Sequence, residues 1–350
     1  MKKLLKRKKL VTKKFILVSV LLTVLLGIIM GVAFGNTPMD LEASDEWLDF
    51  IDQSTFTIES LEVESNGYKI ETQLFIPEGG ADKKPVVVFT GGSGHGIYQD
   101  YSGKFTMEVI IEYYHSHDFA VVLHNKRGMG ESEGNWVFND FYGRAEDVGA
   151  ILDVVKTHSK IDPSNMGVLG HSQGGWIAPL VASQRDDVAF WVAYAGPATS
   201  YIEQLEDLHE TFYACDGYTD EEIEGRIKTK VLVSKIGAKI GKVIPIGDIN
   251  FDADVIDYDP ADMLRDLEVP GMFLFGENDP LVDPDRNAAA LERIYGSELP
   301  NNISAYVVPS ADHSFRVVED FCTPFDVSLQ QLFAPELFEQ LDLWLESLGY

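Results

Sequence analysis

The sequence has few cysteines: Cys215 and Cys322 are the only two among 350 residues. Two cysteines do not make a disulfide framework, and neither lies within a spacing that is typical of metal ligands. A small disulfide-stapled fold and a cysteine-based metal site are therefore excluded. Whether the two cysteines pair with each other stays open.

Basic residues are scarce beyond the N-terminus. The first 14 residues carry eight Lys or Arg and no acid, which leaves 20 basic and 56 acidic side chains in residues 15–350, a net charge of −36. A surface that acidic repels phosphate groups. The composition therefore predicts no nucleic-acid partner and a body that does not lie flat on anionic lipid.

One long segment lacks charge altogether. Residues 15–34 are 20 consecutive uncharged, mostly apolar residues, enough to span the hydrocarbon core of a bilayer as a helix with a rise of about 1.5 Å per residue. Because flanking cations stay on the cytoplasmic side, we expect a basic cytoplasmic tail over 1–14 and a transmembrane anchor over 15–35. The rest of the chain is then outside the cytoplasm, held at the cell membrane by a single pass. A signal peptide cleaved near the small residues Ala33 and Gly35 is the alternative, and it gives a secreted protein.

The chain beyond the apolar segment has the pattern of one α/β domain. After a polar linker over 36–55, apolar and polar residues alternate on both sides of Asn66-Gly67, which predicts a β-hairpin over 56–77. Short apolar runs then alternate with helix-length segments, at 85–90, 119–124, 166–170, 188–193, 272–275 and 305–308. This alternation predicts a mostly parallel sheet with helices on both faces, within a domain over 56–350.

Residues from about 199 to 258 break this alternation. Helix-length stretches at 201–212 and 219–236 are followed by a segment rich in Gly and Asp. A helical insertion between sheet strands usually lies over the carboxyl edge of the sheet, where ligands bind. We therefore expect a helical cap over the functional site.

The strongest single motif is Gly170-His171-Ser172-Gln173-Gly174. It follows the apolar run 166–169 and precedes a helix-compatible segment over 176–183. Strand, tight turn and helix are the context of a nucleophile elbow, in which the flanking glycines permit a strained turn that exposes the serine hydroxyl. Ser172 is the candidate nucleophile.

A serine hydroxyl is a poor nucleophile unless a base takes its proton, so one of the eight histidines must act with it. His171 adjoins the serine and is expected to point away from it, whereas His95 and His124 are on early loops that could line a pocket. Four others fall in predicted helices or at their ends: His115, His117, His158 and His209. His313 alone follows the serine at the carboxyl end of a predicted strand, which makes it the candidate base.

A carboxylate must orient this histidine and hold its tautomer. Asp279 follows the apolar run 272–275 and is the candidate acid, with Glu277, Asp283 and Asp285 as nearby alternatives. Along the chain, the three candidates follow one another as serine, acid and histidine. This is the order expected for the α/β-hydrolase fold.

Acyl transfer also needs backbone N–H groups that bind the developing oxyanion. The residue after the nucleophile, Gln173, is one candidate, and Gly91 or Gly92, in the glycine-rich loop directly after the run 85–90, is the other. Such a loop also occurs in nucleotide-binding sites. The sequence has neither G-x-G-x-x-G spacing nor a Walker lysine here, which argues against a nucleotide.

These motifs, in this order, resemble the alpha/beta-hydrolase family, especially its esterase and serine-aminopeptidase-like members, over roughly residues 56–348. Residues 126–132 are similar to the R-G-x-G-x-S loop of that family, and Ile161-Asp162-Pro163 precedes the elbow strand as it often does there. Two positions depart from the family pattern: Thr90-Gly91 replaces the frequent His-Gly, and Asn125 stands where an Asp is common.

The resemblance implies a serine hydrolase with Ser172, His313 and Asp279 as its triad and no metal or organic cofactor. A carboxylic ester of modest size is the first substrate expected. A short peptide or other amide is the second, and acyl transfer to an alcohol the third. A non-catalytic binding protein on the same fold is the rival from another class, and the presence of all three triad residues argues against it.

Overall fold

The structure, a computed structural model, describes residues 41–100, 107–243, 248–322 and 333–350. The basic tail, the predicted transmembrane segment 15–35 and the first part of the predicted linker lie outside these ranges. Within them, no helix is both long and apolar enough to cross a membrane.

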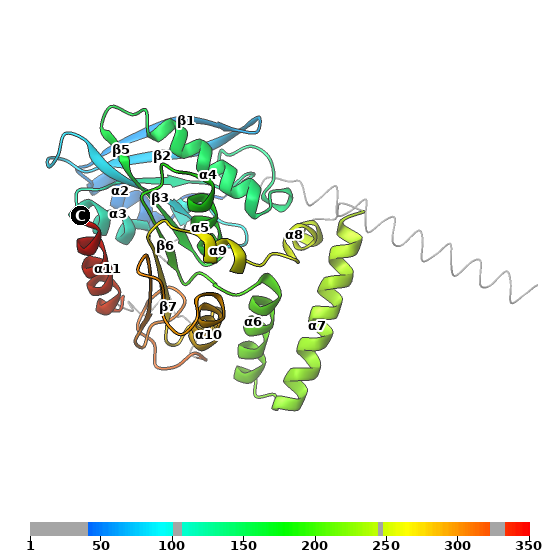
Figure 1. The fold of residues 1–350 in the computed structure, drawn as a ribbon. Helices are drawn as coiled ribbons and strands as arrows, with labels where there is room; N and C mark the ends of the chain where they lie inside the picture. Colours follow the sequence, from blue (N-terminus) through cyan, green and yellow to red (C-terminus); the bar gives the residue numbers. More distant parts are fainter. Residues whose placement is uncertain (1–40, 101–106, 244–247, 323–332) are drawn as a thin grey trace, which may run out of the picture.

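A single eight-stranded sheet forms the centre of the fold, with strand order β1-β2-β4-β3-β5-β6-β7-β8 (Figure 1). Strands β3 to β8 run parallel, and β2 pairs antiparallel with both β1 and β4. The strands are β1 Thr57–Ser65, β2 Tyr68–Ile76, β3 Lys84–Thr90, β4 Ala120–His124, β5 Ile161–His171, β6 Phe190–Tyr194, β7 Gly271–Gly276 and β8 Ile303–Val308. The predicted mostly parallel sheet with an antiparallel start is confirmed.

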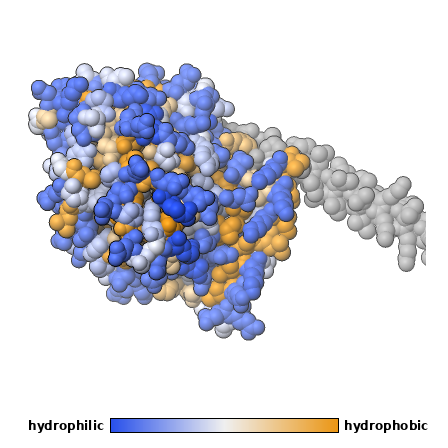
Figure 2. All heavy atoms as spheres, in the orientation of Figure 1, coloured by the Kyte–Doolittle hydropathy of each residue, from blue (hydrophilic) through white to orange (hydrophobic). Residues whose placement is uncertain are grey.

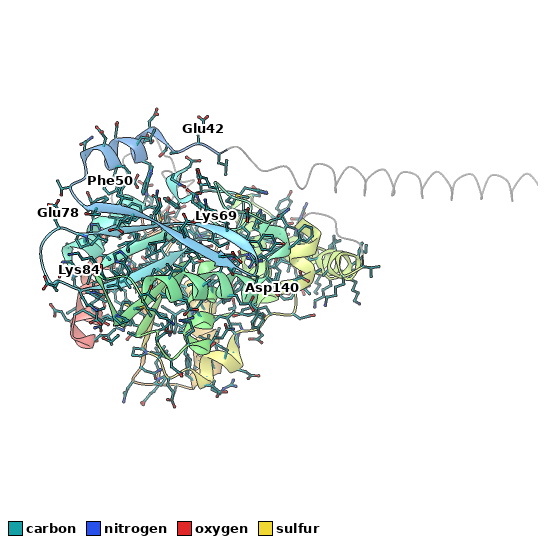
Figure 3. All side chains as sticks on the ribbon, turned by 90° about the horizontal axis from the view of Figure 1, so that it is seen from above. Glu42, Phe50, Lys69, Glu78, Lys84 and Asp140 are labelled. Carbon is teal, nitrogen blue, oxygen red and sulfur yellow. A yellow bond between two sulfur atoms is a disulfide. The ribbon has the colours of Figure 1, made fainter. Side chains whose placement is uncertain are left out.

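The hairpin β1–β2 turns at the predicted Asn66-Gly67. Both residues have positive φ, 51° and 80°, as the two central residues of a type I′ turn require, and Asn and Gly tolerate that conformation best. Figure 3 shows this edge of the sheet from above, with Lys69 near one end of β2 and Glu78 beyond the other. The hairpin therefore starts the sheet at the edge far from the candidate triad.

Two layers of helices cover the two faces of the sheet (Figure 1). Alternate residues of β3 belong to opposite cores: Val86 and Val88 pack with α4 and α5, and Val87 and Phe89 with α3. Strands buried on both faces explain why the runs are apolar throughout. The helices of the two layers are α2 Asp45–Gln53, α3 Met107–Ser116, α4 Phe141–Val155, α5 Gly174–Gln184, α9 Ala261–Asp266, α10 Pro284–Tyr295 and α11 Pro335–Leu348.

The predicted linker over 36–55 is corrected in its second half, because residues 45–53 form helix α2. Ser44 caps it by accepting a hydrogen bond from the backbone N–H of Trp47. Trp47 is buried, and its ring contacts those of Phe75 and Tyr98 at centroid distances of 5.9 and 5.5 Å. The folded body thus begins before residue 56, because one aromatic side chain in a polar segment reaches the core.

The predicted cap consists of three helices, α6 Tyr201–Cys215, α7 Asp220–Gly241 and α8 Asp248–Val255, inserted between β6 and β7. Ser200 with Glu203 and Thr219 with Glu222 form capping boxes that start α6 and α7. Ala238, Ala253 and Ile256 form a small core where α7 meets α8. Figure 1 shows α6 and α7 as an antiparallel pair beside the sheet.

The two cysteines, left open by the sequence, form a disulfide between Cys215 and Cys322, with the Cα atoms 5.4 Å apart. Cys215 is the last residue of α6, and Cys322 lies in the segment that follows the candidate base His313. The bond therefore ties the cap to the body of the domain. Disulfides persist in oxidising compartments and are rare in the cytosol.

Candidate active site

Ser172 occupies the predicted elbow between β5 and α5. Its φ of 56° is in the left-handed region that non-glycine residues rarely adopt. A Cβ on Gly170 would lie 1.9 Å from the carbonyl oxygen of Gly174, and a Cβ on Gly174 would lie 2.2 Å from that of Thr90. The two glycines are therefore required for the close approach of strand, turn and helix that exposes the serine.

The loops after β7 and β8 bring Asp279 and His313 together. Nδ1 of His313 lies 2.8 Å from Oδ2 of Asp279, and the Asp279 side chain is fully buried. The other carboxylate oxygen, Oδ1, accepts hydrogen bonds from the backbone N–H groups of Leu281 and Val282 at 2.8 and 3.0 Å. The carboxylate is thus fixed, and His313 donates its Nδ1–H to it, which leaves Nε2 free to accept a proton.

The three alternative acids, Glu277, Asp283 and Asp285, have other roles in the structure. Glu277 accepts a hydrogen bond from the backbone N–H of Ser310 at 2.7 Å and so supports the loop that carries the histidine. Asp283 caps α10 by accepting from the N–H of Arg286. Asp285 lies in the first turn of that helix. Among the four acids, the structure pairs Asp279 with His313.

The loop that carries His313 is held from two further sides. Asp312 accepts hydrogen bonds from the backbone N–H groups of Ser314 and Arg316, and burial raises the pKa of its carboxyl group. His171, instead of leaving the site, donates from Nε2 to the carbonyl oxygen of His313 at 3.0 Å, with the ring centroids 4.9 Å apart. The residue before Ser172 therefore helps to hold the loop that carries His313.

The serine hydroxyl itself forms no hydrogen bond with any residue that the structure describes. The His313–Asp279 pair is assembled, whereas the link from His313 to Ser172 is not. In enzymes without bound substrate, catalytic hydrogen bonds are often long and tighten only in the complex.

The glycine-rich loop after β3 lies against the nucleophile. A Cβ on Gly92 would be 3.1 Å from Cβ and 3.5 Å from Oγ of Ser172, so the backbone of Gly92 faces the serine. Gly91 turns its carbonyl oxygen toward Arg144, which donates to it at 2.6 Å. Gly92 of this loop thus lies against Ser172, and Gln173, the other candidate oxyanion donor, directly follows the serine at the start of α5.

Two cations that the sequence analysis missed hold this loop. Arg144, buried in α4, donates to the side chains of Thr90 and Gln173 as well as to Gly91. Lys126 donates to the carbonyl oxygens of Gly92 and Gly94 at 2.9 and 2.6 Å. Arg144 is the one basic residue of segment 141–155, and this was the available signal in the sequence.

The loop similar to R-G-x-G-x-S has a structural role. Arg127 forms a buried ion pair with Asp147 at 2.6 Å and stacks on Tyr68. Ser132 donates to the carbonyl oxygen of Asn125 and accepts from the N–H of Glu71, each at 2.8 Å. These bonds fix the chain after β4, from which Lys126 reaches the glycine loop.

The two early-loop histidines do not join the triad. The His95 ring packs edge-on against Trp136, with the centroids 5.2 Å apart. His124 ends β4, where burial and then the nearby charge of Arg144 lower its pKa to about 4. His124 is therefore neutral near pH 7.

A pocket of about 170 Å³ opens at Ser172 and Gln173. Cap helix α6 and the segment after Asp279 supply most of its apolar lining. The other lining residues are Ser93, Trp176, Pro197, Tyr201, Gln204, Leu205, Leu208, Leu281 and Val282. Among the described residues, no cluster of His, Cys, Asp and Glu is arranged to hold a metal ion.

Comparison with known proteins agrees with this geometry. A family model described as serine aminopeptidase, S33, matches residues 81–215, from just before β3 to the end of α6. An esterase from Pyrococcus furiosus has a similar fold, with a TM-score of 0.58 and 16% identity over 89% of this chain and 97% of its own. The chain has the fold of the alpha/beta hydrolases. The serine at the turn between β5 and α5 occupies the position of the nucleophile elbow in that fold.

Two further proteins are similar to this chain, one in sequence and one in fold. The esterase EstD of Thermotoga maritima is 24% identical over 304 residues, which are 85% of this chain and 69% of that protein. The structure of Est1E from Butyrivibrio proteoclasticus with ferulic acid bound has a TM-score of 0.51 and 15% identity over 81% of this chain and 98% of its own.

Proposed function

We propose that this chain is a serine hydrolase that cleaves carboxylic esters of modest size. The observation that carries the proposal is the buried Asp279–His313 pair, fixed at 2.8 Å beside the elbow that exposes Ser172. An imidazole whose Nδ1–H is held by a buried carboxylate has its Nε2 available as a base. Such an arrangement next to a strained serine is suited to activating the hydroxyl.

The proposed reaction has two steps. Ser172 Oγ attacks the ester carbonyl carbon while Nε2 of His313 accepts its proton, and the backbone N–H groups of Gln173 and Gly92 bind the oxyanion. The tetrahedral intermediate collapses, the alcohol leaves with the proton from His313, and an acyl-enzyme remains. Water then attacks the acyl carbon and gives a proton to His313. The second tetrahedral intermediate collapses, Ser172 Oγ takes the proton back from His313, and the carboxylic acid is released. This scheme requires no metal or organic cofactor.

The pocket supports a small substrate. Its volume of about 170 Å³ and its apolar lining from Trp176, Leu205 and Leu208 suit a short acyl or aryl group better than a long chain. We therefore expect a p-nitrophenyl ester with a short acyl chain to be hydrolysed, and activity to fall as the acyl chain outgrows the pocket. Release of p-nitrophenol from the acetate, butyrate and decanoate esters measures this. No turnover of any of them would contradict the proposal.

Amide cleavage is the second candidate, because the matching family model is described as serine aminopeptidase. Comparing a p-nitrophenyl ester with the p-nitroanilide of matched acyl group separates the two activities. Turnover of the anilide alone would favour the peptidase, and formation of a new ester in the presence of an alcohol would favour acyl transfer.

We also propose that the catalytic domain lies outside the cytoplasm, on the membrane anchor predicted for residues 15–35. The disulfide between Cys215 and Cys322 supports an oxidising compartment. The protein should stay in the membrane fraction after carbonate washing, and added protease should digest it from outside the cell. Recovery of a soluble protein that begins at Asn36 would favour a cleaved signal peptide instead.

A further inference from the structure

Cap helix α7 carries an unusual concentration of positive charge. Residues 225–247 contain six of the 20 basic residues found beyond residue 14, and no acid. These six are Arg226, Lys228, Lys230, Lys235, Lys239 and Lys242. The net charge of −36 over residues 15–350, from which we expected a body that avoids anionic lipid, includes these six cations and does not show that they are concentrated in one helix.

The same helix exposes a row of large apolar side chains. Leu232, Val233, Ile236 and Ile240 are 44 to 59% exposed, and Val243, just beyond the helix, is 80% exposed. At about 100° per residue, the four side chains within the helix lie within about 100° of its circumference, and Val243 follows them directly after the C-cap. We call these five residues the α7 stripe. Figure 2 shows apolar side chains gathered over α7.

The α7 stripe is not needed to hold the cap together. The buried residues of α7 are Ile223, Ala238 and Gly241, on the side opposite the stripe, where Ala238 packs against α8. The helix therefore has two apolar sides, and only the inner one is covered by the cap. A contiguous exposed apolar side on a folded domain marks an interaction surface.

Cations border the α7 stripe along both edges. By the same helical geometry, Lys235 and Lys239 lie along one edge, and Lys230 lies along the other. An apolar side with Lys and Arg beside it is the pattern of a helix that lies in a membrane interface. A second copy of the chain fits less well, because pairing α7 with α7 would double the positive charge at the contact.

We propose that α7 docks on a bilayer surface rich in anionic lipid, with the α7 stripe among the acyl chains and the bordering lysines at the head groups. Each Lys or Arg near such a surface adds to the attraction. If residues 15–35 are a retained anchor, the six residues from 36 to Leu41 reach at most about 20 Å, so the membrane lies close to the domain. Docking goes beyond the proposed hydrolysis, because it places the cap at the lipid surface. Helix α6 of this cap lines the pocket at Ser172.

Tryptophan fluorescence tests this docking in the full chain. The five native tryptophans are at most 8% exposed, so a sixth at position 236 reports on the α7 stripe. Full-length Ile236→Trp is reconstituted in vesicles of phosphatidylglycerol with brominated acyl chains. We expect its added emission to be quenched. Leu343→Trp is the matched control, because Leu343 is 61% exposed on α11, on the other side of the molecule in Figure 1, and should not be quenched.

The role of charge is tested in the Ile236→Trp background. Quenching should weaken with Lys235→Glu and Lys239→Glu together, in brominated phosphatidylcholine, and in 1 M salt, where the screening length falls to about 3 Å. Lys83→Glu with Lys160→Glu, two exposed lysines of the body, should not weaken it. Unchanged turnover of a soluble p-nitrophenyl ester shows that each variant is folded, and it tests the proposed function independently.

Two results would overturn the proposal. Absence of quenching in the anionic vesicles would mean that the α7 stripe faces water or is covered by protein, either a second copy or the N-terminal segment of the same chain. Quenching that is equally strong in neutral lipid and after charge reversal would exclude recognition of anionic head groups.

Discussion

Replacing Ser172 with alanine is expected to lower the turnover of a p-nitrophenyl ester by about 10⁴-fold or more, the size of loss seen when a serine hydrolase loses its nucleophile. The fold should survive, because the elbow depends on the backbone contacts of Gly170 and Gly174 and not on the hydroxyl. The measurement is the initial rate of ester hydrolysis per mole of protein for the wild type and the variant. Circular dichroism shows that the variant is folded.

A fluorophosphonate, which reacts with activated serines, should label the wild type and not the variant. Ser93→Ala is the matched control, since Ser93 lines the same pocket, and it should be labelled as the wild type is. Undiminished labelling of Ser172→Ala would place the nucleophile elsewhere.

Local signals were enough to predict much of the fold. The turn at Asn66-Gly67 and the strand–turn–helix around Ser172 depend on residue types that few other conformations favour, so a short stretch of sequence fixes them. The strands were predictable because parallel strands covered on both faces are apolar throughout. His313 followed from its place after the last strand.

The remaining features depend on contacts between distant residues. The disulfide joins residues separated by 107 positions, and nothing near Cys215 in the sequence indicates Cys322. Arg144 is recognisable as part of the site only when α4 is seen beside the glycine loop, where it reaches Gly91 and the side chain of Gln173. The same is true of His171, because its contact with His313 joins the end of β5 to the loop after β8.

The sequence determined the choice of Asp279 least, since four acids lie between 277 and 285. In the structure, these acids have different contacts. Glu277 supports the backbone of Ser310, Asp283 caps α10, and Asp279 alone of the four bonds to His313. An amide side chain retains an oxygen acceptor for the first two roles, toward a backbone N–H or as a cap. It cannot accept the Nδ1–H of the base through its amide nitrogen.

Asp279→Asn should therefore inactivate the enzyme without unfolding it. The asparagine oxygen can still accept from the N–H groups of Leu281 and Val282, which turns its NH₂ group toward Nδ1 of His313. The imidazole must then carry its proton on Nε2, the wrong tautomer for taking a proton from Ser172. The loss expected near pH 7 is on the order of 10⁴ in turnover, as for the same change in a serine protease.

The neighbouring acids provide the controls. Asp283→Asn keeps a helix cap, Asp285→Asn removes an acid from the first turn of α10, and Glu277→Gln weakens one bond to the loop of the base. Each should change turnover by less than about tenfold, because none of the three contacts the proton-transfer chain. Initial rates of ester hydrolysis, with circular dichroism on each variant, decide the assignment. If Glu277→Gln or Asp283→Asn were the inactive variant while Asp279→Asn retained turnover, the acid would be reassigned, whereas Ser172 and His313 would keep their proposed roles.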